Sequence, residues 1–169
     1  VYVREHTNTI MPLKYILSCF WEGQEGSFLL WMFWHCALGW VIIATAGEWE
    51  NGVMFVISLV QIFLASMILG VVILGYKMGN NPFVLLRDHP DFANLPFIKM
   101  PDYLSKIKDG RGLNPLLQNY WMTIHPPTLF LGFASTVIPF AFAIAGLMRK
   151  KFTEWIKPAM PWTFFGVMI

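Results

Sequence analysis

The sequence predicts an all-α, multi-pass transmembrane helical bundle, and three observations support that fold class. The 169 residues are 56% hydrophobic, only 13% are charged, and the mean hydropathy is +0.54. A soluble domain of this length could not bury so much apolar surface. Three stretches also lack Asp, Glu, Lys and Arg, and each is long enough to cross a hydrocarbon core of about 30 Å; they are residues 27–46, 53–76 and 128–148.

A fourth apolar stretch, 162–169, follows Pro161, and we interpret it as the start of a truncated transmembrane helix. The chain begins with Val1, so we expect a fragment of a larger polytopic protein. No charged segment with a cleavage site precedes the first span, so no secretory signal peptide is predicted. The net charge of +2 and the lack of a basic face argue against nucleic acid as a partner. Cys19 and Cys36 have no Cys-x-x-Cys spacing, and we expect them to be packing residues.

Residues 1–26 precede the first span, and they contain one amphipathic stretch, Pro12–Glu22. Its apolar residues recur at helical spacing, which predicts a short helix lying in the membrane interface with Lys14, Ser18 and Glu22 toward water. The alternative is the end of an earlier transmembrane hairpin. The apolar positions are Leu13, Ile16, Leu17, Phe20 and Trp21.

The connections predict how the spans are arranged. Residues 47–52 are too few for more than a tight turn, so the first two spans should be antiparallel neighbours. Residues 77–127 are rich in Pro and Gly and should form an extramembrane loop region. Residues 149–161 should form a short loop on the opposite side of the membrane. The cluster 149–151 of three basic residues favours a cytoplasmic position for that second loop. The total count, eight Lys/Arg on the first side against four on the second, favours the reverse, and the residues alone leave the orientation open.

His125 is the histidine whose position is most suggestive. Asn114 can cap a helix that starts at Pro115, and a residue before proline disfavours the α conformation, so this surface helix should stop at or before His125. Pro127 would then open the third span. The imidazole would stand at a stiff corner at headgroup level, where it could ligate a heme iron. From geometry alone, however, the stronger interpretation is that the corner simply anchors a helix end.

The other three histidines are weaker candidates. His6 and His89 lie in turn-like polar surroundings typical of surface residues. His35 lies inside the first span, where an ionisable group is a functional candidate. A neutral histidine there can also simply hydrogen-bond a neighbouring helix.

Two long motifs resemble one known family. Residues 21–31, Trp-Glu-Gly-Gln-Glu-Gly-Ser-Phe-Leu-Leu-Trp, resemble the Trp-x-Gly-x-Glu-Gly-Ser-Leu-Leu-Leu-Trp signature of the cytochrome c assembly family. Residues 110–118, Gly-Arg-Gly-Leu-Asn-Pro-Leu-Leu-Gln, followed by His-Pro-Pro at 125–127, resemble its second signature. Within the family the chain looks most like the large membrane subunit of bacterial cytochrome c heme lyases. The similarity runs from about Tyr2 to the last residue.

The resemblance implies a function in cytochrome c biogenesis. Relatives present heme b on the outer face of the bacterial inner membrane, where it is attached to apocytochrome c through thioether bonds. The chain would therefore be a multi-pass membrane protein with residues 1–26 and 77–127 on the periplasmic side and 149–161 in the cytoplasm. Its partners would be membrane lipid, apocytochrome c, a heme-delivering chaperone and other maturation subunits. It would be part of a heme lyase (holocytochrome c synthase) and inactive alone.

The resemblance also assigns residues to the heme site. His125 would be the axial ligand of the heme iron, in a setting formed by Trp21, Glu25, Trp121, Pro126 and Pro127. Glu25 could instead simply face the dipole of the helix that starts near Ser27. Some relatives have a histidine where this chain has Gln24, so that position cannot be a ligand here. Two rival functions stay open: a heme or small-molecule transporter with His35 along its path, and a structural subunit of a respiratory complex.

Overall fold

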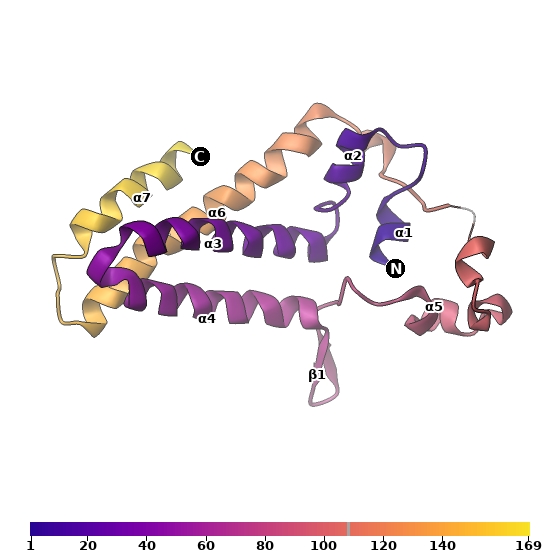
Figure 1. Ribbon diagram of the computed structural model, residues 1–169, viewed down its shortest axis with the longest axis horizontal. Coiled ribbons are helices and arrows are strands. Elements are labelled where there is room, and N and C mark those ends of the chain that lie inside the picture. Colours follow the sequence, from indigo (N-terminus) through magenta and orange to yellow (C-terminus); the bar gives the residue numbers. More distant parts are fainter. Residues whose placement is uncertain (108) are drawn as a thin grey trace.

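Three long helices form the body of the molecule. A computed structural model describes residues 1–107 and 109–169; Lys108, in the predicted loop region 77–127, lies outside the described residues. The long helices are α3 (Gln24–Thr45), α4 (Glu50–Leu69) and α6 (Tyr120–Met148). Each is long and apolar enough to cross a membrane, and α7 (Ile156–Met168) lies beside α6 (Figure 1). The predicted fold class, a helical membrane bundle, is confirmed.

The second span is shorter than its apolar run suggested. It follows a 3-10 turn, η1 (Gly47–Trp49), and ends at Leu69 rather than Tyr76. Gly70 ends it in the left-handed conformation, with φ 65° and ψ 42°, which a glycine adopts without strain. The next residues form an antiparallel hairpin of β1 (Val71–Ile73) and β2 (Tyr76–Met78). The β-branched Val71, Val72 and Ile73 favour strand, so the hydropathy that predicted a helix to Tyr76 was misleading.

The last helix starts earlier than predicted. We expected an apolar helix from Trp162, after Pro161, but α7 begins at Ile156 and contains Pro161. Pro158 lies in its first turn, where the missing N–H has no helical partner to lose. The predicted loop 149–161 is therefore shortened to the residues between α6 and α7.

Small side chains let α4 and α6 approach closely. A Cβ added to Gly52 would stand 2.8 Å from the Cβ of Ala145, so the two backbones are nearly in contact there. Such close crossings are typical of helix pairs in membranes, where packing replaces the hydrophobic effect as the driving force. Larger buried residues fill the space around this crossing: Leu38, Ile42, Trp49, Val53, Val56, Ile57, Ile138 and Phe142.

An ion-pair cluster closes one end of the bundle. The carboxylate of Glu48, in the turn between α3 and α4, accepts hydrogen bonds from Arg149 (2.8 Å) and Lys151 (2.7 Å), just after α6. The Arg149 guanidinium also lies 5.1 Å from the centre of the Trp49 ring. These basic side chains lower the pKa of Glu48 below its ordinary value. The cluster therefore ties the α3–α4 turn to the end of α6.

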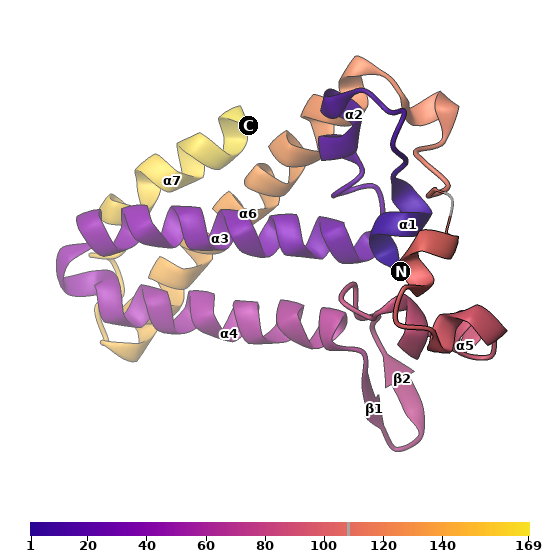
Figure 2. The ribbon, with the colours of Figure 1, turned by 45° about the vertical axis from the view of Figure 1, so that its right-hand side comes forward.

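The opposite end, which we call the loop end, carries residues 1–23, 70–107 and 109–119. Beside α1 (Tyr2–His6) and α2 (Leu13–Ser18), short elements cover it (Figure 2). The predicted interfacial helix is shorter than Pro12–Glu22, and its polar face was misplaced: Ser18 is 0% exposed, whereas Leu13 is 72% exposed. The other short elements are η2 (Leu86–Asp88), α5 (Pro90–Ala93), η3 (Pro96–Lys99), η4 (Tyr103–Lys106) and η5 (Pro115–Leu117).

Candidate functional site at the start of α6

The segment around His125 is helical, contrary to the predicted corner. Asn114 does cap a helix at Pro115, but that helix is the single 3-10 turn η5. A second cap follows: the Asn119 side chain accepts a hydrogen bond from the N–H of Met122 (3.1 Å), and α6 begins at Tyr120. It then runs without a break through His125, Pro126 and Pro127. The surface helix that starts at Pro115 does end before His125, but the predicted corner at His125 and the start of the third span at Pro127 were wrong, because α6 already begins at Tyr120.

A tertiary hydrogen bond compensates for the N–H that Pro126 lacks. Pro126 has no N–H, so the carbonyl of Met122, four residues earlier, loses its helical donor. The indole N–H of Trp21 donates to that carbonyl instead, at 2.9 Å. Transmembrane helices tolerate proline where a neighbouring group satisfies the freed carbonyl in this way. Trp21 thus connects the first motif to the turn that carries His125.

A second contact joins α2 to the same turn. The buried hydroxyl of Ser18 lies 3.1 Å from that of Thr123 and also donates to the carbonyl of Lys14 at 3.0 Å. Thr123 lies four residues before Pro127, so this contact holds α2 against the turn that carries the two prolines. Ser18 is therefore buried because it faces α6, and the apolar residues of α2 point outward.

The backbone of the first motif is packed too tightly for side chains at its glycines. A Cβ on Gly26 would collide with the carbonyl of Phe20. That carbonyl accepts a hydrogen bond from the Tyr2 hydroxyl at 3.0 Å, and the same hydroxyl accepts one from the N–H of Gly23 at 3.0 Å. Burial raises the pKa of Tyr2 to about 12, so its hydroxyl keeps its proton. The Ser27 hydroxyl donates to the carbonyl of Trp21 at 2.9 Å, which helps to fix the tryptophan.

The second motif is docked on α1 and the residues that follow it. The N–H of Arg111 donates to the carbonyl of Arg4 (2.7 Å), and that of Gly112 to the carbonyl of Thr7 (3.2 Å). A Cβ on Gly110 would meet the carbonyl of Thr7. Asp109 accepts hydrogen bonds from the backbone and the hydroxyl of Thr9, which lower the pKa of its carboxyl. Residues about 100 positions apart therefore form one framework around the start of α6.

His125 itself is exposed and lies beside an open hollow of about 440 Å³. Trp121, four residues earlier and thus one turn away on the same side of α6, is 70% exposed. The ring of Tyr120 lies 5.6 Å from that of Trp121, edge on. The hollow is mostly apolar, with one imidazole at its edge. Its lining residues are Leu117, Asn119, Trp121, Met122, His125 and Pro126.

The predicted site residues are brought together only in part. Trp121 and Pro126 line the hollow with His125. Trp21 does not line it, but donates a hydrogen bond to the carbonyl of Met122, which does. Pro127, the next residue of α6, belongs to the same proline pair.

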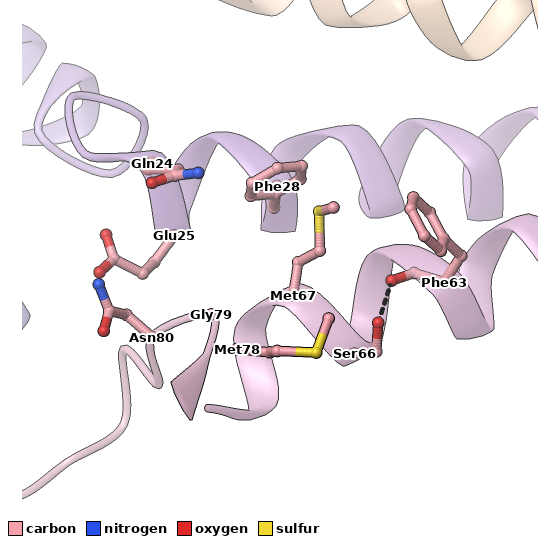
Figure 3. A pocket seen from close by; sticks show the side chains of 9 residues that line it. All are labelled: Gln24, Glu25, Phe28, Phe63, Ser66, Met67, Met78, Gly79 and Asn80. Atoms are coloured by element: carbon pink, nitrogen blue, oxygen red, sulfur yellow. Dashed lines mark hydrogen bonds between the residues drawn. The ribbon is translucent and has the colours of Figure 1, made fainter. Parts of the chain in front are cut away.

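Glu25 lies apart from the hollow beside His125. It belongs to the first turn of α3, which begins at Gln24 rather than near Ser27, and it points toward Asn80 across a separate pocket of about 230 Å³ (Figure 3). An acid in a first turn interacts favourably with the helix dipole. The structure therefore favours the simple helix-end interpretation of Glu25.

The remaining histidines make structural contacts. His6 stacks on Tyr2, with ring centres 4.2 Å apart, and His89 caps α5 by accepting from the N–H of Asp91 (3.3 Å). His35 is 2% exposed, and its Nδ1 lies 3.4 Å from the amide oxygen of Gln61 in α4. This is the helix-to-helix contact that the sequence left open as an alternative to a functional role.

Sequence reasoning missed the carbonyl of Met122 and the hydroxyl pair of Ser18 and Thr123. A signal for the carbonyl was present, since a proline inside a helix always frees the carbonyl four residues earlier. The donor that would satisfy this carbonyl could not be identified, because Trp21 lies about 100 residues away in the chain.

Comparisons with known proteins identify the family to which this sequence belongs. The family model of the cytochrome C assembly protein matches residues 21–166. The chain is 33% identical over 165 residues to the cytochrome c-type biogenesis protein CcmF of Haemophilus influenzae, covering 96% of this chain and 22% of that protein. It is 31% identical over 163 residues to CcmF of Escherichia coli, covering 96% and 22%. A CcmF of Pseudomonas fluorescens is 31% identical over 177 residues, covering 99% and 23%.

No solved structure matches the chain. The chain spans less than a quarter of the length of these curated relatives. The matched region nevertheless contains both motifs and all of the long helices that hold them. This chain is a helical membrane member of the cytochrome c assembly protein family, whose relatives are cytochrome c-type biogenesis proteins.

Proposed function

We propose that this chain is the heme-holding part of a cytochrome c heme lyase in the bacterial inner membrane, with the loop end on the periplasmic side. The observation that carries the proposal is the exposed imidazole of His125 at the edge of an apolar hollow, on a turn that the first motif holds in place. Family membership supplies the setting, cytochrome c biogenesis.

The hollow fits the chemistry of heme b. A neutral imidazole is a common axial ligand of heme iron, and the described residues offer His125 no hydrogen-bond partner that would occupy its ring nitrogens. Trp121 presents an exposed aromatic surface one turn away, and Leu117 and Pro126 add apolar surface for the flat face of a porphyrin. Bound heme would supply the vinyl groups across which the thiols of apocytochrome c add to form thioether bonds.

The residues of this chain would hold and orient rather than transfer protons. His125 lies in a helical turn whose Met122 carbonyl is fixed by Trp21, so less conformational freedom is lost when the imidazole binds iron. The open side of the hollow leaves room for the apocytochrome segment. Partner subunits and a heme-delivering chaperone would dock on the loop end, which carries most of the extramembrane residues.

The proposal is tested with His125→Ala in the full-length protein. We expect the purified variant to retain much less heme and to lose cytochrome c maturation, and added imidazole to restore part of the heme absorption. His89→Ala is the matched control, because His89 also lies at the loop end but caps α5. An unchanged heme spectrum in His125→Ala, or an equal loss in His89→Ala, would refute the assignment.

A further inference from the structure

The hairpin of β1 and β2 projects sideways from the bundle. In Figures 1 and 2 it leaves the end of α4 almost at right angles to that helix and points away from α3 and α6. The 20 residues of α4 extend about 30 Å at 1.5 Å per residue, which equals the thickness of the hydrocarbon core. The hairpin starts two residues beyond Leu69, so it lies at the boundary of the core and extends along the plane of the membrane.

The base of the hairpin is fixed to α4. The N–H of Asn80 donates to the carbonyl of Met67 at 3.2 Å, and a Cβ on Gly79 would collide with the Met67 backbone. The direction in which the hairpin leaves the bundle is therefore set by packing and hydrogen bonding. A free loop would have neither.

Most side chains of the hairpin are apolar and exposed, and contact of so much apolar surface with water would be unfavourable. The paired residues Val71 and Met78, and Ile73 and Tyr76, lie on one face, because cross-strand partners share a face. All four are exposed, Tyr76 by 79%. The opposite face carries Val72 and Lys77. A two-stranded hairpin of this length is marginal in water by itself, so this one needs a surface to lie on.

The turn gives an independent indication of that surface. Leu74 and Gly75 both have positive φ, 52° and 85°, as a two-residue type I′ turn requires. The first central position of a type I′ turn favours Asn, Asp or Gly, and a leucine at that position is strained. Leu74 is nonetheless 93% exposed to the surroundings of the chain. An apolar medium around the tip accounts for a leucine where an aqueous turn would carry a polar residue.

We infer that residues 71–78 form a lipid-interface anchor that lies on the bilayer beside the bundle, with Val71, Ile73 and Tyr76 toward the acyl chains and Lys77 toward water. Membrane proteins often carry Tyr and Lys at the boundary between lipid and water. The tyrosine ring is amphipathic, and the long lysine side chain lets its charged end reach water. The anchor would hold the loop end at a fixed height above the membrane.

The test measures lipid contact in the full-length protein, reconstituted into phosphatidylcholine vesicles. An environment-sensitive fluorophore is attached to Leu74→Cys, Tyr76→Cys or Lys77→Cys after Cys19 and Cys36 have been replaced by alanine. Tyr76 and Lys77 are a matched pair, since they are adjacent in β2 and lie on opposite faces. Quenching by lipids that carry a nitroxide on the acyl chain is compared with quenching by iodide in the water.

We expect the nitroxide lipid to quench the labels at Leu74 and Tyr76 several-fold more than the label at Lys77, and iodide to show the reverse order. Iodide quenching of all three labels alike would place the hairpin in water. Protection of Leu74 and Tyr76 from both quenchers would place it against protein. Either result would overturn the inference, and neither depends on heme, so the proposed function is tested separately.

Discussion

Replacing Trp21 by Phe tests the contact on which the site geometry rests. The substitution keeps an aromatic ring but removes the N–H that donates to the carbonyl of Met122 at 2.9 Å. Because Pro126 cannot donate to it, that carbonyl would lose its donor, which costs about 1–3 kcal/mol. At about 1.4 kcal/mol per factor of ten, opening of the first turns of α6 should become roughly 5- to 150-fold more frequent.

Hydrogen–deuterium exchange of the full-length protein in detergent measures this opening directly. Peptides that cover the start of α6 should exchange faster in Trp21→Phe by that factor, and peptides from α4 should not change. Trp40→Phe is the control, because Trp40 is 76% exposed and lies on the outside of α3. The same loss should lower heme retention if the turn positions His125 as we propose.

A double-mutant cycle makes the test specific to the carbonyl. In Pro126→Ala, the new N–H at position 126 can donate to Met122 within the helix. In this background, Trp21→Phe should lower the free energy of opening the start of α6 by at least about 1 kcal/mol less than it does when Pro126 is present. If the two substitutions were strictly additive, or if Trp21→Phe left exchange unchanged, the explanation of the unbroken helix would be wrong.

Two further substitutions test the framework at each end of the bundle. Gly26→Ala should prevent normal folding, because its Cβ would meet the Phe20 carbonyl. Gly132→Ala should be tolerated, because its Cβ would be 3.5 Å from its nearest neighbour. The two variants are compared by their yield and by thermal unfolding in detergent. Glu48 has a lowered pKa, so its ion pairs should stabilise the protein above about pH 4.3 and lose their effect as the pH falls through the folded value. Glu48→Gln should remove that acid dependence of thermal unfolding, and Glu154→Gln should not.

The long helices were predictable because hydropathy and length are properties of a local stretch. Their ends were less so, since each depends on a feature that hydropathy does not measure. For α4 that feature is Gly70 in a left-handed conformation. The apolar residues after it are β-branched, and they form a hairpin although they continue the hydrophobic run. A stricter use of Gly70 as a stop signal would have found the boundary.

Only some of the residues grouped at the candidate site lie together, and its shape was not predictable. His125, Trp121 and Pro126 do line one hollow. The local preference of a residue before proline favoured a corner there, and a hydrogen bond from Trp21 overrode it. Glu25 was grouped with the site because it belongs to the same motif as Trp21, yet successive residues point in different directions, and Glu25 faces Asn80.

The hydrogen bond from Trp21 also links the two motifs physically. The two consecutive prolines leave the carbonyls of Met122 and Thr123 without helical N–H donors, and lipid acyl chains cannot supply any. A donor for the Met122 carbonyl has to reach it from outside the helix. Trp21 does so because Gly26 allows the chain to fold tightly behind it. The first motif thus supplies a hydrogen bond that the helix around His125 and Pro126 cannot make within itself.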